Sequence, residues 1–168
     1  MSAGDVILYA TDEACPHRAS YRTNISAATF REGEPVVLDA SNELVECAVV
    51  DPPAITGIAV EPAVSRSNMM AALETSDTFR LIERWVPQNT FICRYFATDG
   101  AGTLTTPTHA NAVGQLGNLY SNGTQWTFDT GAANNNCVGI DVLDASGNSL
   151  QNDLVPNTAG VYVVVRPL

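Results

Sequence analysis

The chain has 168 residues and a formal net charge of −10, and all eight of its basic residues are arginine. This length suits one domain with one hydrophobic core. Because nucleic acids and anionic membranes are bound mainly through cationic side chains, the charge disfavours both and favours a protein partner. A second interpretation stays open, in which the acidic surface serves solubility alone.

The N-terminal residues 1–18 contain neither the basic start nor the apolar run of a secretory signal, and no apolar window reaches the roughly 18 residues of a membrane span. Synthesis in a cytoplasm is therefore expected, where thiols stay reduced. The four cysteines form no CxxC pair, which predicts no disulfide and no bound metal; they are Cys15, Cys47, Cys93 and Cys137. Cys47 and Cys93 alternate with apolar residues, so we expect small buried side chains there.

The first 29 residues are expected to form an N-terminal arm, and residues 30–168 a single β domain. Residues 5–10 can make one strand, but the segment from there to Ala28 is polar and unpatterned, which indicates an arm or long loop. Such terminal segments often become ordered only against a neighbour.

Residues 30–61 read as a complete small β unit, a hairpin followed by a third strand. Its parts are the apolar run Val36–Leu38, the turn Asp39–Asn42, the return strand Leu44–Val50, the break at Pro52-Pro53 and the third strand Ile55–Val60.

The middle of the chain is predicted to hold one short helix, a second hairpin and a surface loop. Residues 64–77 are the helix, with Ser67 as a possible cap. Residues 79–86 and 91–98 alternate around a turn at Pro87 and are read as the hairpin. The small, polar stretch 99–112 is expected on the surface.

The last third is the clearest β sequence. Residues 113–119 and 125–129 are read as a hairpin whose Asn122-Gly123 tip suits a type I′ turn. Residues 137–143, a turn at 144–148 and the terminal strand 160–166 follow. The expected fold is mostly β: a small β-barrel or two-layer β-sandwich with long loops, an N-terminal arm and at most one short helix.

A short sequence recurs, since Val37-Leu38-Asp39-Ala40-Ser41 is repeated as Val142-Leu143-Asp144-Ala145-Ser146. Each copy places an aspartate where its carboxylate can accept bonds from backbone N–H groups two residues on. Duplication of a β unit is one explanation; favourable turn chemistry alone is the preferred one.

Searching the chain for chemistry yields no catalytic, cofactor-binding or metal-binding residue, and we expect no enzyme. His17 and His109 lie in predicted loops without a second ligand cluster or a nucleophile motif. Cys15-Pro16-His17 supplies two possible ligands at most. The turn at Asp144 lacks the spacing of a calcium loop.

Two pairs of acids flank strands of the 30–61 unit, Glu32/Glu34 and Glu43/Glu46. A glycosidase uses two carboxylates, but it also needs a cleft lined by aromatic side chains, and only 7% of the residues are aromatic. The acid pairs are therefore not assigned a catalytic role.

The strand "EGEPVVLD", the return strand "LVECAVV" and the stretch "ITGIAVEPA" resemble the small β domains of tailed-phage head decoration, or cement, proteins. The likeness covers residues 30–62 and, more loosely, 113–167. It implies a structural virion protein that binds the outside of an icosahedral bacteriophage capsid, contacts the major capsid protein and bridges capsomers for head stabilisation as a homotrimer. The arm 1–29 and the loop 99–112 are the expected contact segments.

The alternative is a carbohydrate- or receptor-binding β module of a phage fibre or spike. Such a module presents exposed aromatic side chains to its ligand, and Trp85, Tyr120 and Trp126 are the residues that would form this platform.

Overall fold

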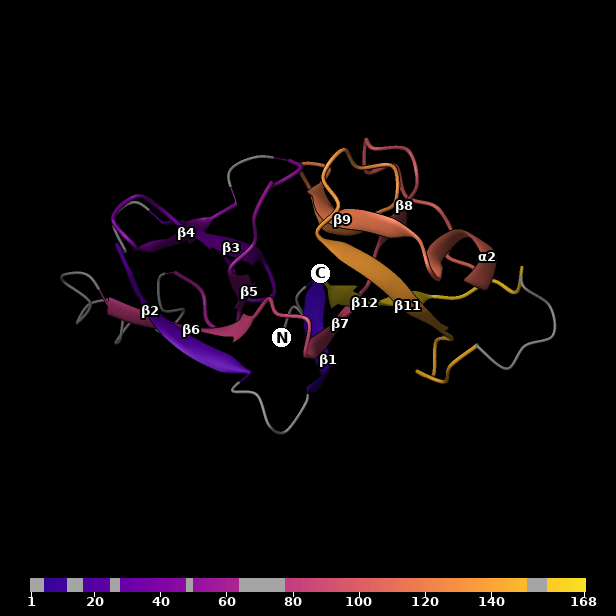
Figure 1. The fold of residues 1–168 in the computed structure, drawn as a ribbon, viewed down its shortest axis with the longest axis horizontal. Helices are drawn as coiled ribbons and strands as arrows, with labels where there is room; N and C mark the ends of the chain where they lie inside the picture. Colours follow the sequence, from indigo (N-terminus) through magenta and orange to yellow (C-terminus); the bar gives the residue numbers. More distant parts are fainter. Residues whose placement is uncertain (1–4, 12–16, 25–27, 48–49, 64–77, 151–156) are drawn as a thin grey trace.

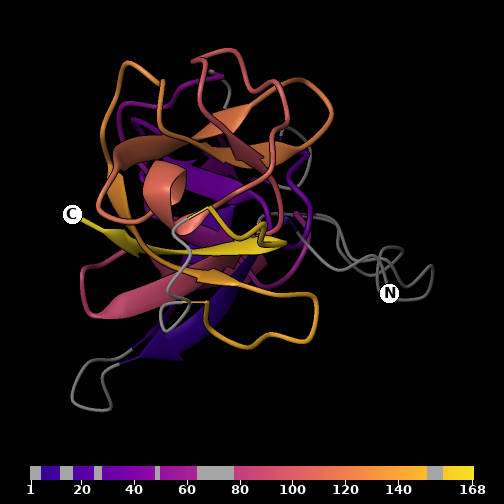
Figure 2. The same ribbon diagram turned by 90° about the vertical axis from the view of Figure 1, so that its right-hand side faces the viewer.

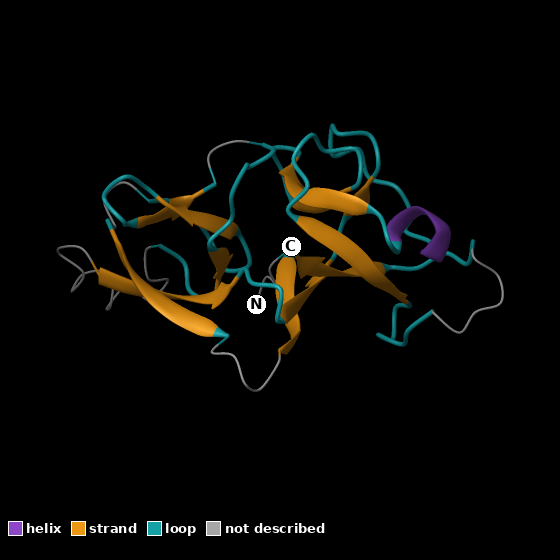
Figure 3. Cartoon of the chain, viewed as in Figure 1, coloured by secondary structure: helices purple, strands orange, loops and turns teal. Residues whose placement is uncertain are grey.

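The computed structural model describes residues 5–11, 17–24, 28–47, 50–63, 78–150 and 157–168. The prediction of a mostly β fold is confirmed: the described strands form two sheets, with one short helix (Figures 1 and 3). The larger sheet has the order β1 (Val6–Thr11), β7 (Asn89–Cys93), β12 (Tyr162–Pro167), β11 (Cys137–Leu143), β9 (Leu116–Ser121), β10 (Trp126–Asp129), β8 (Phe96–Ala97). The smaller has the order β2 (Arg18–Thr23), β6 (Thr78–Arg84), β5 (Gly57–Ala59), β3 (Pro35–Leu38), β4 (Leu44–Glu46).

The seven-stranded sheet is strongly curled. Only Arg94 and Tyr95 separate β7 from β8 along the chain, yet four strands lie between them in the sheet. Neighbouring strands are about 4.8 Å apart, so a flat sheet would place β7 and β8 roughly 24 Å from each other, far beyond the reach of a two-residue link. The curl stops short of a closed barrel among the described strands, which fits the sandwich of the two predicted alternatives.

The concave side of this sheet holds the main core. Phe91, Phe128, Leu119, Val163 and Val165 are fully buried there. Their inward direction follows from the alternation of side chains along each strand.

One helical turn, α2 (His109–Ala112), covers part of the sheet at β11 and lies in front of the strands in Figure 2. Thr108 and Asn111 form a capping box that fixes its start, and Ala112 is its buried residue. The prediction of a surface loop over 99–112 therefore missed this helix.

The five-stranded sheet contains the predicted β unit. As expected for residues 30–61, β3 and β4 form an antiparallel hairpin, and β5 pairs with β3 on its other side. The return strand ends at Glu46, earlier than predicted. Phe30, Val36, Leu44 and Ile82 fill a second core on one face of the sheet.

The two sheets share one core through the other face of the smaller sheet. Ile58 of β5 and Cys47, just after β4, belong to the same buried cluster as Phe91 and Trp126 of the larger sheet. The chain also crosses between the sheets twice, from β1 to β2 and from β6 to β7. Shared burial and repeated crossing make the two sheets one packed body.

The prediction of a long loop between residues 11 and 28 is wrong at residues 18–23. These residues form β2, which pairs with β6 along its whole length. Ala19 and Tyr21 pack on the second core, while Arg18, Ser20 and Arg22 face outward. Because the outward residues are polar and the inward ones small or amphipathic, the strand has little of the apolar alternation by which strands are recognised. The described part of residues 1–29 thus gives one strand to each sheet.

The predicted hairpin of residues 79–86 and 91–98 is also wrong. A turn does lie at Pro87, where Asn89 N–H donates to Val86 O (2.9 Å), but β6 and β7 pair with different strands in different sheets. Asn89 holds this corner: its side chain is fully buried, donates to Arg84 O (2.8 Å) and accepts from Thr11 Oγ1 (2.7 Å). The sequence alone predicts that two successive strands pair with each other. The contacts of Asn89 show instead that the chain turns a corner here and passes from one sheet to the other.

The hairpin of β9 and β10 is confirmed, but its tip is not a type I′ turn. Gly123 has φ 85°, whereas Asn122 is not among the described residues with positive φ. The Asn122 side chain instead accepts from the N–H groups of Thr124 and Gln125 at 3.0 Å each, in a four-residue loop. The predicted helix at 64–77 lies outside the described residues.

Candidate functional site

The two histidines lie in different parts of the fold. His17 directly precedes β2, and its carbonyl accepts from Arg84 N–H (2.7 Å). His109 begins α2 beside the larger sheet. Cys15 and Pro16, the possible partners of His17, lie outside the described residues. Within the described ranges, no group of three or more histidine, cysteine or acidic side chains is arranged to hold a metal ion.

Three cysteines are buried in the shared core, as predicted for Cys47 and Cys93. Burial raises the pKa of the Cys47 thiol to about 12, with a further contribution from Glu46. Burial likewise raises the pKa of the thiols of Cys93 and Cys137. These thiols are therefore protonated at neutral pH and act as apolar filling rather than as nucleophiles.

The repeated Asp-Ala-Ser sequence forms the same turn twice. Asp39 Oδ1 accepts from the N–H groups of residues 41 and 43 (2.8 and 2.9 Å), and Asp144 Oδ1 accepts from those of residues 146 and 148 (2.8 and 2.9 Å). The fourth residue has positive φ in both, Asn42 at 58° and Gly147 at 83°. The Asp144 carboxylate is thus committed to its own turn, as predicted for a hairpin.

A third copy of this turn has an unrelated sequence. Asp99 Oδ1 accepts from Ala101 N–H (3.0 Å) and Thr103 N–H (3.2 Å), and Gly102 has φ 69°. Hydrogen bonds to the ionised form lower the pKa of Asp99, led by the one from the Thr103 side chain. The shared geometry therefore follows from turn chemistry, which agrees with the preferred explanation of the repeat.

Two further carboxylates tie long loops to the sheets, and the sequence analysis did not single them out. Asp129, fully buried at the end of β10, accepts from the N–H groups of Gly100, Gly102 and Gly131 at 3.1, 3.0 and 2.8 Å. The three glycines near Asp129 are the sequence feature that could have indicated this contact. They allow the two loops to approach each other closely, since a Cβ at Gly100 or Gly131 would lie 2.5 Å from a backbone atom of the other loop.

Asp51, in the loop between β4 and β5, joins the smaller sheet to the larger sheet. Its carboxylate accepts from Asn118 Nδ2 (2.6 Å), Ala133 N–H (2.9 Å) and Asn134 N–H (3.1 Å). Asn136 donates to Pro52 O (2.9 Å) beside it. Every one of these polar contacts holds one chain segment against another, so the network works as a structural brace.

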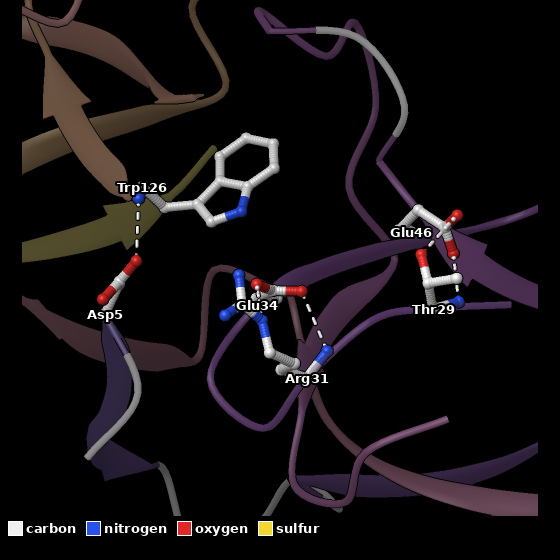
Figure 4. Close-up of polar contacts among 6 residues, drawn as sticks. All are labelled: Asp5, Thr29, Arg31, Glu34, Glu46 and Trp126. Atoms are coloured by element: carbon white, nitrogen blue, oxygen red, sulfur yellow. Dashed lines mark hydrogen bonds and ion pairs between the residues drawn. The ribbon is translucent and has the colours of Figure 1, made fainter. Parts of the chain in front are cut away.

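The acid pairs do not act as pairs. The Glu34 carboxylate accepts from Arg31 N–H (2.8 Å) and Arg31 Nε (2.9 Å). The Glu46 carboxylate accepts from Thr29 N–H (2.9 Å) and Thr29 Oγ1 (3.0 Å), as Figure 4 shows. Glu43, directly before β4, pairs with Arg22 of β2 at 3.3 Å, so this ion pair joins the two edge strands of the smaller sheet. Glu34 therefore stabilises its own turn, whereas Glu43 and Glu46 hold β4 to other segments.

Asp5 closes the curl of the larger sheet. Its Oδ2 accepts from Trp126 N–H (2.9 Å), which links the start of β1 to the start of β10, and the Arg31–Glu34 pair lies nearby (Figure 4). Burial, with a smaller contribution from Glu34, raises the pKa of the Asp5 carboxyl.

The three aromatic side chains that would mark a glycan platform are not exposed. Trp126 is buried in the shared core, and Trp85 is half-buried with its ring centroid 4.8 Å from that of Phe91. Tyr120 is half-buried beside Gly102. The marker named for the carbohydrate-binding alternative is therefore missing at these positions.

Exposed apolar side chains occur instead on the edge strand β1, on β6 beside the edge strand β2, on β9 and in loops. β1 presents Ile7 and Tyr9, which share one face because side chains alternate along a strand, and the pairing with β7 shifts register between Leu8 and Ala10. Phe79 of β6, facing the edge strand β2, is 67% exposed, and Leu104 lies open in the loop after β8. These side chains are the candidate contact points for another protein.

Comparison with known proteins identifies no relative: no family model, no curated protein and no solved structure matches the chain. Among the described residues, no helix is long and apolar enough to span a membrane.

Proposed function

We propose that the chain is a structural virion protein, a head decoration or cement protein that binds the exterior of an icosahedral phage capsid. In this role it contacts the major capsid protein and bridges capsomers as a homotrimer. In this role the protein catalyses no reaction, needs no cofactor and binds neither nucleic acid nor a membrane. It is synthesised in the host cytoplasm.

The observation that carries the proposal is the three-stranded unit formed by residues 30–62. The stretch that resembles decoration proteins folds as the hairpin and third strand that the resemblance implies, with β3 between β4 and β5. Around it, the half-buried Asp51 and the buried Asp129 hold loops through their carboxylates. A braced body with apolar side chains on its edges suits bridging, which requires rigidity and contact surface.

Two of the exposed side chains fall in the segments expected to contact the shell. Tyr9 is 50% exposed in the described part of residues 1–29, and Leu104 is 49% exposed in the loop 99–112. Removal of residues 1–24 would not separate attachment from folding, because it deletes β1 and β2. Single substitutions at Tyr9 and Leu104 are the suitable variants.

The test is co-sedimentation of purified protein with the matching expanded capsids. The wild-type chain is expected to pellet with the shells at a fixed ratio. Tyr9→Ser and Leu104→Ser should weaken attachment, and Leu116→Ser, an equally exposed apolar side chain on β9, serves as the control. Absence of wild-type protein from the pellet, together with binding to a glycan surface, would favour the fibre or spike module instead.

A further inference from the structure

The tip of the hairpin between β9 and β10 holds the one Asn-Gly pair of the sequence, Asn122-Gly123. Both residues are exposed, as is Thr124 after them. The backbone nitrogen that follows an asparagine is a potential nucleophile toward the side-chain amide. A side chain on the following residue shields this nitrogen, and a glycine leaves it open. At Gly123 an added Cβ would meet no atom within 4 Å, so the nitrogen of this residue is unshielded.

The side-chain amide of Asn122 is held as an electrophile. Its Oδ1 accepts from Thr124 N–H and Gln125 N–H at 3.0 Å each. Attack on the amide carbon would place negative charge on this oxygen, and two backbone N–H donors at such a distance stabilise that charge. The same two bonds fold the Asn122 side chain back over Gly123, which brings the amide carbon toward the glycine nitrogen.

The nucleophile also has a partner for its proton. Gly123 N–H donates to Ser121 Oγ (3.2 Å). A hydroxyl both accepts and donates, so Ser121 can take this proton while passing its own to solvent at the exposed tip. Nucleophile, electrophile and proton acceptor thus occupy three consecutive residues.

We propose that Asn122 is a self-modification site that converts to aspartate or isoaspartate through a cyclic imide with Gly123. The glycine nitrogen loses its proton through Ser121 and forms a bond to Asn122 Cγ, and the carbonyl electron pair moves to Oδ1. When this pair returns, the Cγ–Nδ2 bond breaks and Nδ2 leaves with a proton as ammonia. Water then opens either carbonyl of the imide, so the net change is asparagine plus water to an acid plus ammonia.

The reaction would release a neighbouring loop. Asn122 Nδ2 donates to Gly102 O (3.2 Å), and this bond joins the hairpin tip to the loop that follows β8. An acid in place of the amide has no donor for this carbonyl and sets a negative oxygen beside it. Asp129 Oδ2 still holds Gly102 N–H (3.0 Å), so the loop is expected to loosen locally rather than to unfold.

Peptide mass spectrometry of the purified chain, incubated at mildly alkaline pH, tests the reaction. Conversion at Asn122 should be at least about tenfold faster than at Asn148, an exposed turn residue followed by serine. Conversion should be slower in guanidinium chloride and in the Ser121→Ala variant, because both remove parts of the folded arrangement. Equal rates at Asn122 and Asn148, or faster conversion of the unfolded chain, would overturn the proposal.

Hydrogen exchange tests the release of the loop. In Asn122→Asp, which mimics one product, exchange at the Gly102 and Thr103 amides should accelerate by about fivefold or more, the factor for loss of one neutral hydrogen bond. Asn148→Asp adds the same charge at a distant turn and should leave both amides unchanged. Unaltered exchange in Asn122→Asp would contradict the release. No capsid is present in either experiment, so the outcomes are independent of the proposed function.

Discussion

Single carboxylates hold several of the loops in the described part of the chain. Asp129 alone accepts three backbone N–H groups from two loops, and Asp51 fixes a third segment against β9. Hydrogen bonds to a charged acceptor are stronger than neutral ones, and a buried donor left without an acceptor carries its full desolvation cost. Loop order here therefore depends on a few residues.

Asp129→Ala is expected to lower the free energy of unfolding by about 2–4 kcal/mol, because buried N–H groups lose their acceptor. Urea unfolding measures this change. Hydrogen exchange at the amides of Gly100, Gly102 and Gly131 should accelerate in the same variant. Full retention of protection at these amides would show that the carboxylate does not hold the loops.

Asp5 gives a signed pH effect. Burial raises the pKa of Asp5 in the folded state, so folding disfavours the ionised carboxylate. The free energy of unfolding should therefore increase as the pH falls from above the folded pKa toward the unfolded value near 3.8. Asp5→Asn keeps an acceptor for Trp126 N–H and removes the charge, so its stability at pH 7 should equal or exceed that of the wild type, without the acid-side gain.

The contrasting variant Asp5→Ala should be about 1–2 kcal/mol less stable than Asp5→Asn at every pH, because both variants lack the titrating group and only in Asp5→Ala does Trp126 N–H lack its partner. Urea midpoints between pH 4 and pH 7 measure both variants. Equal pH slopes for the wild type and Asp5→Asn would contradict the assignment of the titrating group.

Gly123 occupies a conformation that disfavours other residues. Its φ is 85°, although a Cβ there would meet no atom within 4 Å. Gly123→Val should therefore cost about 1–3 kcal/mol through backbone strain alone. Gly123→Asn is the matched control with a smaller loss, since Asn42 already adopts φ 58° in this chain. Identical urea midpoints for the two variants would argue against strain.

At the scale of elements, the corner between β6 and β7 decides the topology. Asn89 joins the ends of β1, β6 and β7 through its buried side chain. Asn89→Ala should destabilise the fold by about 2–4 kcal/mol, because two partners inside the protein lose their bonds. Thr90→Ala, which removes a 3.3 Å bond to Ala10 O at an exposed site, should cost less than about 1 kcal/mol. Thermal or urea unfolding compares the two.

Strands with strong apolar alternation and local turn chemistry were predictable from sequence. The hairpin of β3 and β4, the return of β9 into β10 and the turn at Asp144 all follow from residues next to each other. Strand β2 was missed because its outward face is polar. The separation of β6 from β7 depends on contacts of Asn89 with Thr11, 78 residues away, which no local pattern records.

The prediction of the candidate site was correspondingly uneven. Sequence identified Cys47 and Cys93 as buried, and the alternation of Phe79 with Arg80 along β6 was visible. The sequence did not show which side of β6 faces solvent, because that depends on the packing of Ile82 with Phe30 and Val36. The exposure of Phe79 was therefore known only from the structure.

For the whole molecule, two sheets with a shared core form one packed body, and exposed apolar side chains lie on β1, β6 and β9 and in loops. A shell under pressure from packaged DNA fails where capsomers part, so a rigid protein bridging several of them stabilises that point. In the cement role proposed above, three copies acting together would make attachment strong even where each contact is weak.

The measurement that most directly tests this account is calorimetry of matching expanded capsids with and without the purified protein. Saturating protein is expected to raise the disruption temperature of the shell, and to do so less in the Tyr9→Ser and Leu104→Ser forms than in the Leu116→Ser control. A shell transition that stays at the same temperature at saturation would contradict a stabilising role on the capsid.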